Sequence, residues 1–165
     1  MTDTKSKPLV AVLMGSASDW ETMQHCSKTL DELGVPHDCQ ALSAHRNPEK
    51  LHTYVRDAEK NGVKVFIGAA GGAAHLPGVL ASLTAKPVLG VPMVAWSLDG
   101  LDSLLSIAQM PAGIPVGTLA IGKAGAKNAA ILATQILAVG DEKYAKAIVD
   151  MRKKQSETVQ ELPRK

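Results

Sequence analysis

Residues 43–48 (SAHRNP) place a histidine and an arginine side by side, at His45 and Arg46. Histidine exchanges protons near neutral pH, and arginine can hold a phosphate through two parallel hydrogen bonds. The segment follows a predicted strand and precedes a predicted helix start, at Asn47 and Pro48. The pair therefore points to an anion-binding, proton-exchanging loop, with a polar surface turn as the alternative.

A second loop, residues 15–19 (GSASD), combines Gly15 with two serine hydroxyls at a predicted helix start. Exposed N–H groups and the helix dipole favour a phosphate at such a point. Ser18 and Glu21 match a capping box and predict Ser18 as the N-cap. The pattern is neither a dinucleotide fingerprint nor a P-loop. Asp19 either caps the helix or accepts hydrogen bonds from sugar hydroxyls, and a plain strand-to-helix turn is the alternative.

The third loop, residues 68–75 (GAAGGAAH), has almost no side chains. Without them, backbone N–H groups can face a ligand directly, so a flat ring or CO₂ could lie against this surface. Tight packing of a helix on the sheet is the alternative reading. His75 is either a second polar group of the site or an anchor for the loop.

The other histidines and both cysteines lie inside predicted helices or strands. We interpret His25, His37 and His52 as surface or packing residues. Cys26 and Cys39 form no CxxC pair and lack metal-ligand spacing, which predicts reduced thiols in a cytosolic protein.

Composition narrows the class of protein. With 165 residues, 45% hydrophobic and 21% charged, the chain fits one globular domain over residues 1–165. A net charge of +2 without a basic, aromatic-rich stripe argues against nucleic-acid binding. No run approaches the roughly 20 apolar residues of a membrane span, and the polar segment 1–8 predicts a disordered tail rather than a signal peptide. These features predict a cytoplasmic protein.

Short apolar runs alternate with helical patterns along the chain. Strands are predicted at residues 9–15, 35–42, 63–67, 87–91 and 114–121. Helices are predicted at residues 18–33, 48–60, 76–83, 101–109, 124–139 and 141–161. This alternation predicts an α/β fold, a doubly wound parallel sheet in a flavodoxin-like three-layer α/β/α arrangement. With strand order 2-1-3-4-5, the three loops above meet at one sheet edge, where such folds bind ligands.

The core and the last helix raise the question of assembly. Aromatic residues make up only 3% of the chain, so the core must consist mainly of Ala, Val, Leu and Ile. Such a core makes additional burial between subunits plausible. Residues 141–165 predict an extra, highly charged C-terminal helix, which is either a frayed tail or an arm packed on a neighbouring subunit.

Four ordered motifs resemble the bacterial PurE family, the class I N5-carboxyaminoimidazole ribonucleotide mutases. They are GSASDW (15–20), SAHRNP (43–48), GGAAHLPG (71–78) and DSLLSIAQMPAGIPVGTLAIGKAGAKNAA (102–130). The resemblance extends over residues 9–139. It implies a flavodoxin-like fold, a homo-octamer and an isomerase of de novo purine synthesis that needs no cofactor and no metal. The substrate would be N5-carboxyaminoimidazole ribonucleotide and the product 4-carboxyaminoimidazole ribonucleotide.

The resemblance also implies roles for individual residues. His45 would be the general acid and base: it would protonate the nitrogen as CO₂ leaves and deprotonate ring carbon 4 after recarboxylation. Ser16 and Asp19 would bind the substrate, with Asp19 on the ribose. The phosphate would be held by Ser18, Ser43 and Arg46. The base and carboxyl site would be lined by Gly71, Gly72, Ala73, Ala74, His75 and Leu76.

Two departures and two alternatives accompany the resemblance. Ala69 stands where many members have glycine, and its methyl group is expected to narrow the loop slightly. Residues 96–99 (WSLD) fall in a variable stretch, and we assign them no role. The alternatives are a direct CO₂-dependent aminoimidazole ribonucleotide carboxylase and a non-catalytic nucleotide-binding module.

Overall fold

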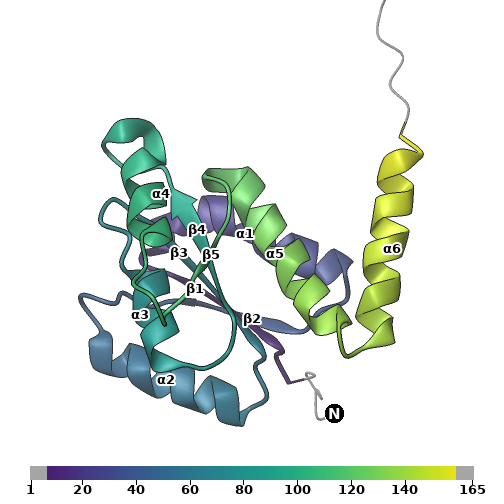
Figure 1. The fold of residues 1–165 in the computed structure, drawn as a ribbon, viewed down its shortest axis with the longest axis horizontal. Coiled ribbons are helices and arrows are strands. Elements are labelled where there is room, and N and C mark those ends of the chain that lie inside the picture. Colours follow the sequence, from purple (N-terminus) through teal and green to yellow (C-terminus); the bar gives the residue numbers. More distant parts are fainter. Residues whose placement is uncertain (1–6, 159–165) are drawn as a thin grey trace, which may run out of the picture.

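A parallel sheet with helices on both faces forms the body of the molecule (Figure 1). A computed structural model describes residues 7–158. Most of the predicted N-terminal tail, residues 1–6, and the end of the predicted last helix, residues 159–165, lie outside the described residues. No helix within residues 7–158 combines the length and apolar character needed to cross a membrane.

The five strands of the sheet are ordered β2-β1-β3-β4-β5, and every neighbouring pair is parallel. Their bounds are β1 Val10–Met14, β2 His37–Ala41, β3 Val65–Gly71, β4 Val88–Met93 and β5 Gly117–Thr118. The predicted strand order is confirmed. It brings the carboxyl ends of β2, β1 and β3 together.

Residues 7–158 also contain six α-helices and two short 3₁₀ turns, of which α5 and α6 follow the last strand. The helices are α1 Trp20–Glu32, α2 Pro48–Lys60, α3 Leu76–Leu83, α4 Leu101–Ala108, α5 Gly122–Ala138 and α6 Glu142–Ser156. The 3₁₀ turns are η1 Ala17–Asp19 and η2 Leu98–Gly100. Helices α2 and α3 have the predicted bounds, and the others differ from prediction by a few residues at their ends, as is usual for helix termini.

Both faces of the sheet are buried, so the core has two halves. Alternate residues of β1 point to opposite sides: Val10 and Val12 pack with α1, α5 and α6, whereas Ala11 and Leu13 pack with α2, α3 and α4. The fully buried apolar side chains that α5 adds to the first half are all alanines (Ala126, Ala129, Ala130 and Ala133). The predicted three-layer architecture and aliphatic core are confirmed.

Helix α6 packs on its own chain through its first half. Tyr144 and Ile148 are buried in the core cluster that contains α5. Asp141 caps the helix, since its carboxylate accepts a hydrogen bond from the backbone N–H of Lys143 at 2.9 Å. Figure 1 shows α6 beside the end of α5, at the margin of the molecule.

Glycines at the centre of the sheet let α3 and α4 approach it closely. Gly68 of β3 and Gly90 of β4 are register partners. A Cβ atom at Gly68 would lie 3.0 Å from Leu80 Cδ1 of α3, and one at Gly90 would lie 2.4 Å from Ile107 Cγ2 of α4. The absence of side chains here therefore fixes how deeply both helices sit on the sheet.

The strands β3 and β5 differ most from prediction, whereas the other three differ by one or two residues at their ends. β3 continues to Gly71, so Ala69 and Ala70 belong to the strand and not to the predicted loop. Pairing with β1 on one side and β4 on the other overrides the low strand propensity of glycine and alanine. β5 contains two residues instead of the predicted eight-residue segment, because only Gly117 and Thr118 pair with β4.

Candidate active site

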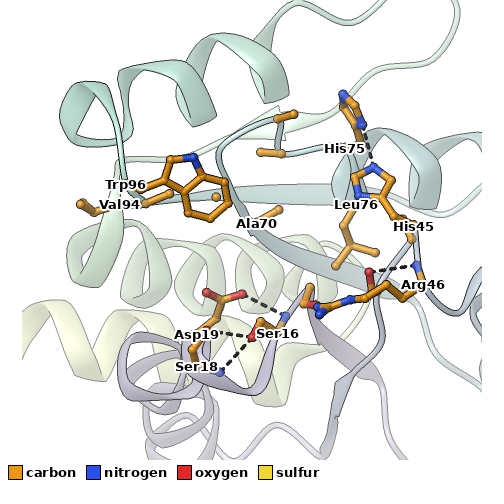
Figure 2. Close-up of a pocket in the computed structure, with 17 residues that line it drawn as sticks. Ser16, Ser18, Asp19, His45, Arg46, Ala70, His75, Leu76, Val94 and Trp96 are labelled. Carbon is orange, nitrogen blue, oxygen red and sulfur yellow. Dashed lines mark hydrogen bonds between the residues drawn. The ribbon is translucent and has the colours of Figure 1, made fainter.

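A cavity of about 540 Å³ opens at the carboxyl ends of β1, β2 and β3. Figure 2 shows the side chains that converge on it from the loops after these strands and from the loop after β4. The lining residues are Gly15, Ser16, Ser18, Asp19, Ser43, Ala44, His45, Arg46, Ala70, Gly71, Ala73, Ala74, His75, Leu76, Val94, Ala95 and Trp96. The structure thus brings all the sequence-predicted site residues together except Gly72, which does not line the cavity.

The loop after β1 is organised by hydrogen bonds among its own side chains. Ser16 is the N-cap of η1: its Oγ accepts from the backbone N–H of Ser18 at 3.3 Å, and Ser18 Oγ donates to it at 2.8 Å. Asp19 completes a capping box by accepting from the backbone N–H of Ser16 at 3.3 Å. The prediction of Ser18 as the N-cap is wrong, because a 3₁₀ turn capped by Ser16 precedes α1, whose own N-cap position is Asp19.

Asp19 lies partly buried at the edge of the cavity. Burial raises the pKa of its carboxyl group above the ordinary value, and the hydrogen bond from the Ser16 N–H partly opposes this rise. Figure 2 shows the carboxylate on the same side of the cavity as Trp96, away from Arg46. An acceptor in this position suits a hydroxyl-rich group of a ligand.

Arg46 links the loops that follow β1 and β2. Its Nη2 donates to the carbonyl oxygen of Gly15 at 3.1 Å, and its backbone N–H donates to the buried Ser43 Oγ at 3.2 Å. A guanidinium has five N–H donors, so this arrangement leaves others to bind an anion. The cation is thereby held next to the serine loop.

His45 and His75 both line the cavity, and their side chains contact each other. His45 precedes α2 and His75 precedes α3, and His45 Nε2 lies 2.8 Å from His75 Nδ1. Their rings meet edge to face, with centroids 5.0 Å apart and an interplanar angle of 89°. Of the two interpretations of His75, the geometry favours a polar group of the site.

The loop after β3 packs closely against the loop after β4. Gly72 has a positive φ of 64°, which favours glycine. A Cβ atom at Gly71 would lie 3.0 Å from Ala95 Cβ, and one at Gly72 would lie 3.1 Å from Trp96 Cζ2. Because Gly71 and Gly72 have no side chains, the loop after β4 can pack directly against them. Ala73, Ala74 and Leu76 line the cavity.

Ala69 does not narrow this loop, so the expectation for its methyl group is wrong. The residue is fully buried in the core cluster with Met14 and Val91, and it is not among the residues that line the cavity. Its carbonyl oxygen accepts a hydrogen bond from the backbone N–H of Gly15 at 3.1 Å. Ala69 therefore belongs to the strand that supports the site.

The sequence-based interpretation missed the loop after β4. Val94, Ala95 and Trp96 line the cavity, yet residues 96–99 were assigned no role. One signal was available, because β4 neighbours β3 in the predicted order and its carboxyl end must reach the same edge. What the sequence did not show is that this loop turns back over Gly72.

The remaining histidines and the cysteines lie away from the cavity, as predicted. His37 bonds to Ser27 Oγ and to the carbonyl oxygen of Val35, at 2.7 and 3.0 Å. Burial raises the pKa of the free thiols Cys26 and Cys39, which makes them poor nucleophiles. Within residues 7–158, no group of three or more His, Cys, Asp or Glu side chains is placed to hold a metal ion.

A three-layer α/β fold with a cavity at the carboxyl ends of its parallel strands is typical of proteins that bind nucleotides and other small molecules. Comparison with known proteins agrees. The family model described as AIR carboxylase matches residues 9–158. The chain belongs to this family.

Curated relatives carry the name N5-carboxyaminoimidazole ribonucleotide mutase. The protein from Brucella melitensis is 56% identical over 154 residues, which cover 93% of this chain and 95% of the relative. That from Escherichia coli K12 is 53% identical over 163 residues, covering 99% and 96%. The solved structure of Treponema denticola PurE superposes with a TM-score of 0.83 at 26% identity, over 91% of this chain and 92% of that one.

Proposed function

We propose that His45 carries the protons of a carboxyl transfer within this cavity. The chain acts as an N5-carboxyaminoimidazole ribonucleotide mutase of purine biosynthesis, an isomerase. The carboxyl group moves from the exocyclic nitrogen of the substrate to ring carbon 4. The observation that carries the proposed role is that His45 faces the small-residue loop after β3 while the adjacent Arg46 is tied to the serine loop.

The phosphate of the ribonucleotide binds at Arg46, Ser18 and Ser43. Arg46 supplies charge-assisted hydrogen bonds, and the serine hydroxyls lie on the two loops that Arg46 connects. Ser16 supports this loop, and the acceptor Asp19 takes a ribose hydroxyl. These contacts direct the base toward His45.

The base and its carboxyl group lie against residues 71–76. Gly71 and Ala74 line the cavity with backbone groups and little side-chain volume, so a flat ring can approach closely. Ala73 and Leu76 add apolar surface next to His75. A small apolar molecule such as CO₂ is retained there with few competing waters.

The reaction begins with His45 as the imidazolium. The bond between the exocyclic nitrogen and the carboxyl carbon breaks, CO₂ leaves, and the nitrogen takes a proton from His45. Ring carbon 4 then attacks the carbon of CO₂, and a new carbon–carbon bond forms. Neutral His45 removes the hydrogen from ring carbon 4, so the ring regains its aromaticity and His45 returns to the imidazolium.

Two physical effects account for the rate. General acid–base catalysis raises a reaction rate by about 10²–10⁴-fold. Retention of CO₂ beside the ring makes a second-order step effectively unimolecular. The electron-rich aminoimidazole supplies the nucleophile, and the residues of this chain supply position and proton transfer.

A turnover assay with two substrates tests the function. N5-carboxyaminoimidazole ribonucleotide is expected to be converted without added bicarbonate, at a rate that added bicarbonate leaves unchanged. Aminoimidazole ribonucleotide with bicarbonate is expected to react far more slowly. The reverse preference would indicate a direct carboxylase, and binding without turnover of either compound would indicate a nucleotide-binding module.

The assembly proposed for this chain is a homo-octamer in the cytoplasm, with residues 1–165 as one domain. Exposed apolar side chains outside the cavity support association of subunits: Leu101, Leu105, Val139 and Val149 are all exposed. The second half of α6 offers a further surface for a neighbouring subunit. Light scattering is expected to give about eight times the chain mass, whereas a mass near 17.3 kDa would contradict the proposal.

A further inference from the structure

Trp96 is a large aromatic side chain at the mouth of the cavity. Its residue is 87% exposed although it lines the same cavity as Asp19 and His45. We propose that the Trp96 indole is a substrate-contacting residue: it stacks against the aminoimidazole ring and closes that side of the cavity to water. This inference rests on the proposed function.

One edge of the indole lies against the loop after β3. A Cβ atom at Gly72 would lie 3.1 Å from Trp96 Cζ2 and 3.5 Å from Cη2, so the six-membered ring of the indole rests on the bare backbone of Gly72. Any other residue at position 72 would displace it. Gly72 also has the left-handed φ of 64° that side chains disfavour.

Both ends of the loop that carries Trp96 are anchored. At the start, Ser103 Oγ donates a buried hydrogen bond of 2.8 Å to the carbonyl oxygen of Met93, the last residue of β4. At the end, Gly100 is so close to Ile121 that a Cβ atom would lie 2.8 Å from its Cγ2. An anchored loop presents the indole at a defined position.

The indole faces the part of the cavity where the base is proposed to bind. Figure 2 shows Trp96 above Asp19 and opposite the side that carries Arg46 and His45. A ligand with its phosphate at Arg46 and its ribose at Asp19 therefore has its flat ring beside Gly71, between His45 on one side of the cavity and the indole on the other. Aromatic rings favour offset-stacked or edge-to-face contacts at such distances.

Closure of the cavity affects whether CO₂ reacts with ring carbon 4 or escapes. If CO₂ escapes before ring carbon 4 attacks it, the products are aminoimidazole ribonucleotide and free CO₂, with a proton delivered by His45. An indole over the ring blocks this escape route and excludes water. Trp96 therefore sets both the affinity for the base and the fraction of substrate that completes the transfer.

Steady-state assays of Trp96→Ala and Trp96→Phe test this inference. For Trp96→Ala we expect KM to rise about threefold to tenfold, the range of an aromatic pair. We also expect more aminoimidazole ribonucleotide per product formed, after subtraction of the enzyme-free rate. Trp96→Phe is expected to bring both KM and the release of aminoimidazole ribonucleotide most of the way back to the values of the unaltered protein. Leu98→Ala, which alters an exposed side chain of the same loop outside the cavity, is the matched control and should change neither value.

Fluorescence gives an independent readout, because the chain has 2 tryptophans. In a Trp20→Phe variant that retains turnover, aminoimidazole ribonucleotide is expected to change the emission of Trp96, whereas ribose 5-phosphate, which lacks the base, is not. The inference would be overturned if Trp96→Ala left KM and the release of aminoimidazole ribonucleotide unchanged, and if the ligand did not alter the emission of Trp96. These results in an active enzyme would leave the proposed function intact. Absence of turnover in the unaltered protein would instead overturn the proposed function.

Discussion

His45 Nε2 and His75 Nδ1 lie 2.8 Å apart, although the residues are 30 positions apart in the chain and precede different helices. At this distance one nitrogen must donate and the other accept, so a single proton lies between them. The contact fixes the orientation of the His45 ring relative to the loop after β3. We therefore expect His75 to act as a positioning residue for His45.

Replacement of His75 by phenylalanine tests this contact. His75→Phe retains an aromatic ring but removes the hydrogen bond, which is worth about 1 kcal/mol, or about fivefold. We expect kcat to fall by about that factor and KM to change less. His75→Asn, which offers polar atoms again, is expected to recover part of the loss. Equal kcat values for His75→Phe and the unaltered protein would contradict the assignment.

His45→Asn separates binding from proton transfer. The variant is expected to bind aminoimidazole ribonucleotide with nearly unchanged affinity, because Arg46 and the serine loop still hold the phosphate. Turnover is expected to fall by about 10²–10⁴-fold, the usual contribution of general acid–base catalysis. Calorimetry and turnover assays measure the two effects, and near-normal turnover would refute the role of His45.

Arg46 is expected to control affinity more than rate. Arg46→Ala removes charge-assisted hydrogen bonds worth about 1.5–3 kcal/mol, so KM should rise about 10- to 100-fold. Arg46→Lys keeps the charge but loses the planar, two-pronged donor, and an intermediate KM is expected. Thermal unfolding of both variants controls for loss of the Gly15 contact. A KM unaffected by Arg46→Ala would place the phosphate elsewhere.

Asp19 and Asp150 should show opposite effects of pH on stability. Burial raises the pKa of Asp19, so its contribution to stability is fully present below the unfolded-state value of about 4 and is lost as pH rises through the folded-state value. The hydrogen bond from Lys146 lowers the pKa of Asp150, whose contribution is lost as pH falls. Relative to the unaltered protein, Asp19→Asn should therefore gain stability as pH rises, and Asp150→Asn should lose it. Urea unfolding between pH 3 and 7 measures both slopes, and slopes of the same sign would contradict this account.

Gly90→Ala tests the close approach of α4 to the sheet. The new Cβ would lie 2.4 Å from Ile107 Cγ2, and overpacking of this kind costs about 1–3 kcal/mol of unfolding free energy. The double variant Gly90→Ala/Ile107→Ala should be less destabilised than the sum of the single variants. Gly140→Ala, which meets no atom within 4 Å, is the control and should change stability by less than about 0.5 kcal/mol. Additive single-variant effects would contradict the proposed contact.

Much of the fold could be predicted because local and long-range signals agree. The strand β1 is apolar on both faces, α2 begins with the expected proline at Pro48, and glycines follow the ends of α1 and α2 at Gly34 and Gly62. Parallel strands joined by helices then allow few topologies. The same logic predicted that Ser16, His45 and His75 meet.

What failed depended on contacts that the sequence does not encode locally. The length of β5 is decided by how far its segment follows β4, and Pro115 and Pro111 near its start cannot donate to a sheet. The cap of η1 was misassigned because Ser16 with Asp19 and Ser18 with Glu21 have the same spacing. The Trp96 loop was missed because its path depends on Gly72, which is distant in sequence.

The two edges of the sheet differ in how much unpaired backbone they expose. β5 pairs through only two residues and offers almost no template for another strand. On the opposite edge, β2 carries Asp38 and Gln40, whose side chains bond to each other at 3.0 Å. Short or charged edges discourage strand addition and amyloid-like aggregation. Contacts between copies of this chain would therefore form through helices and loops, which leaves the sheet unextended even at high concentration.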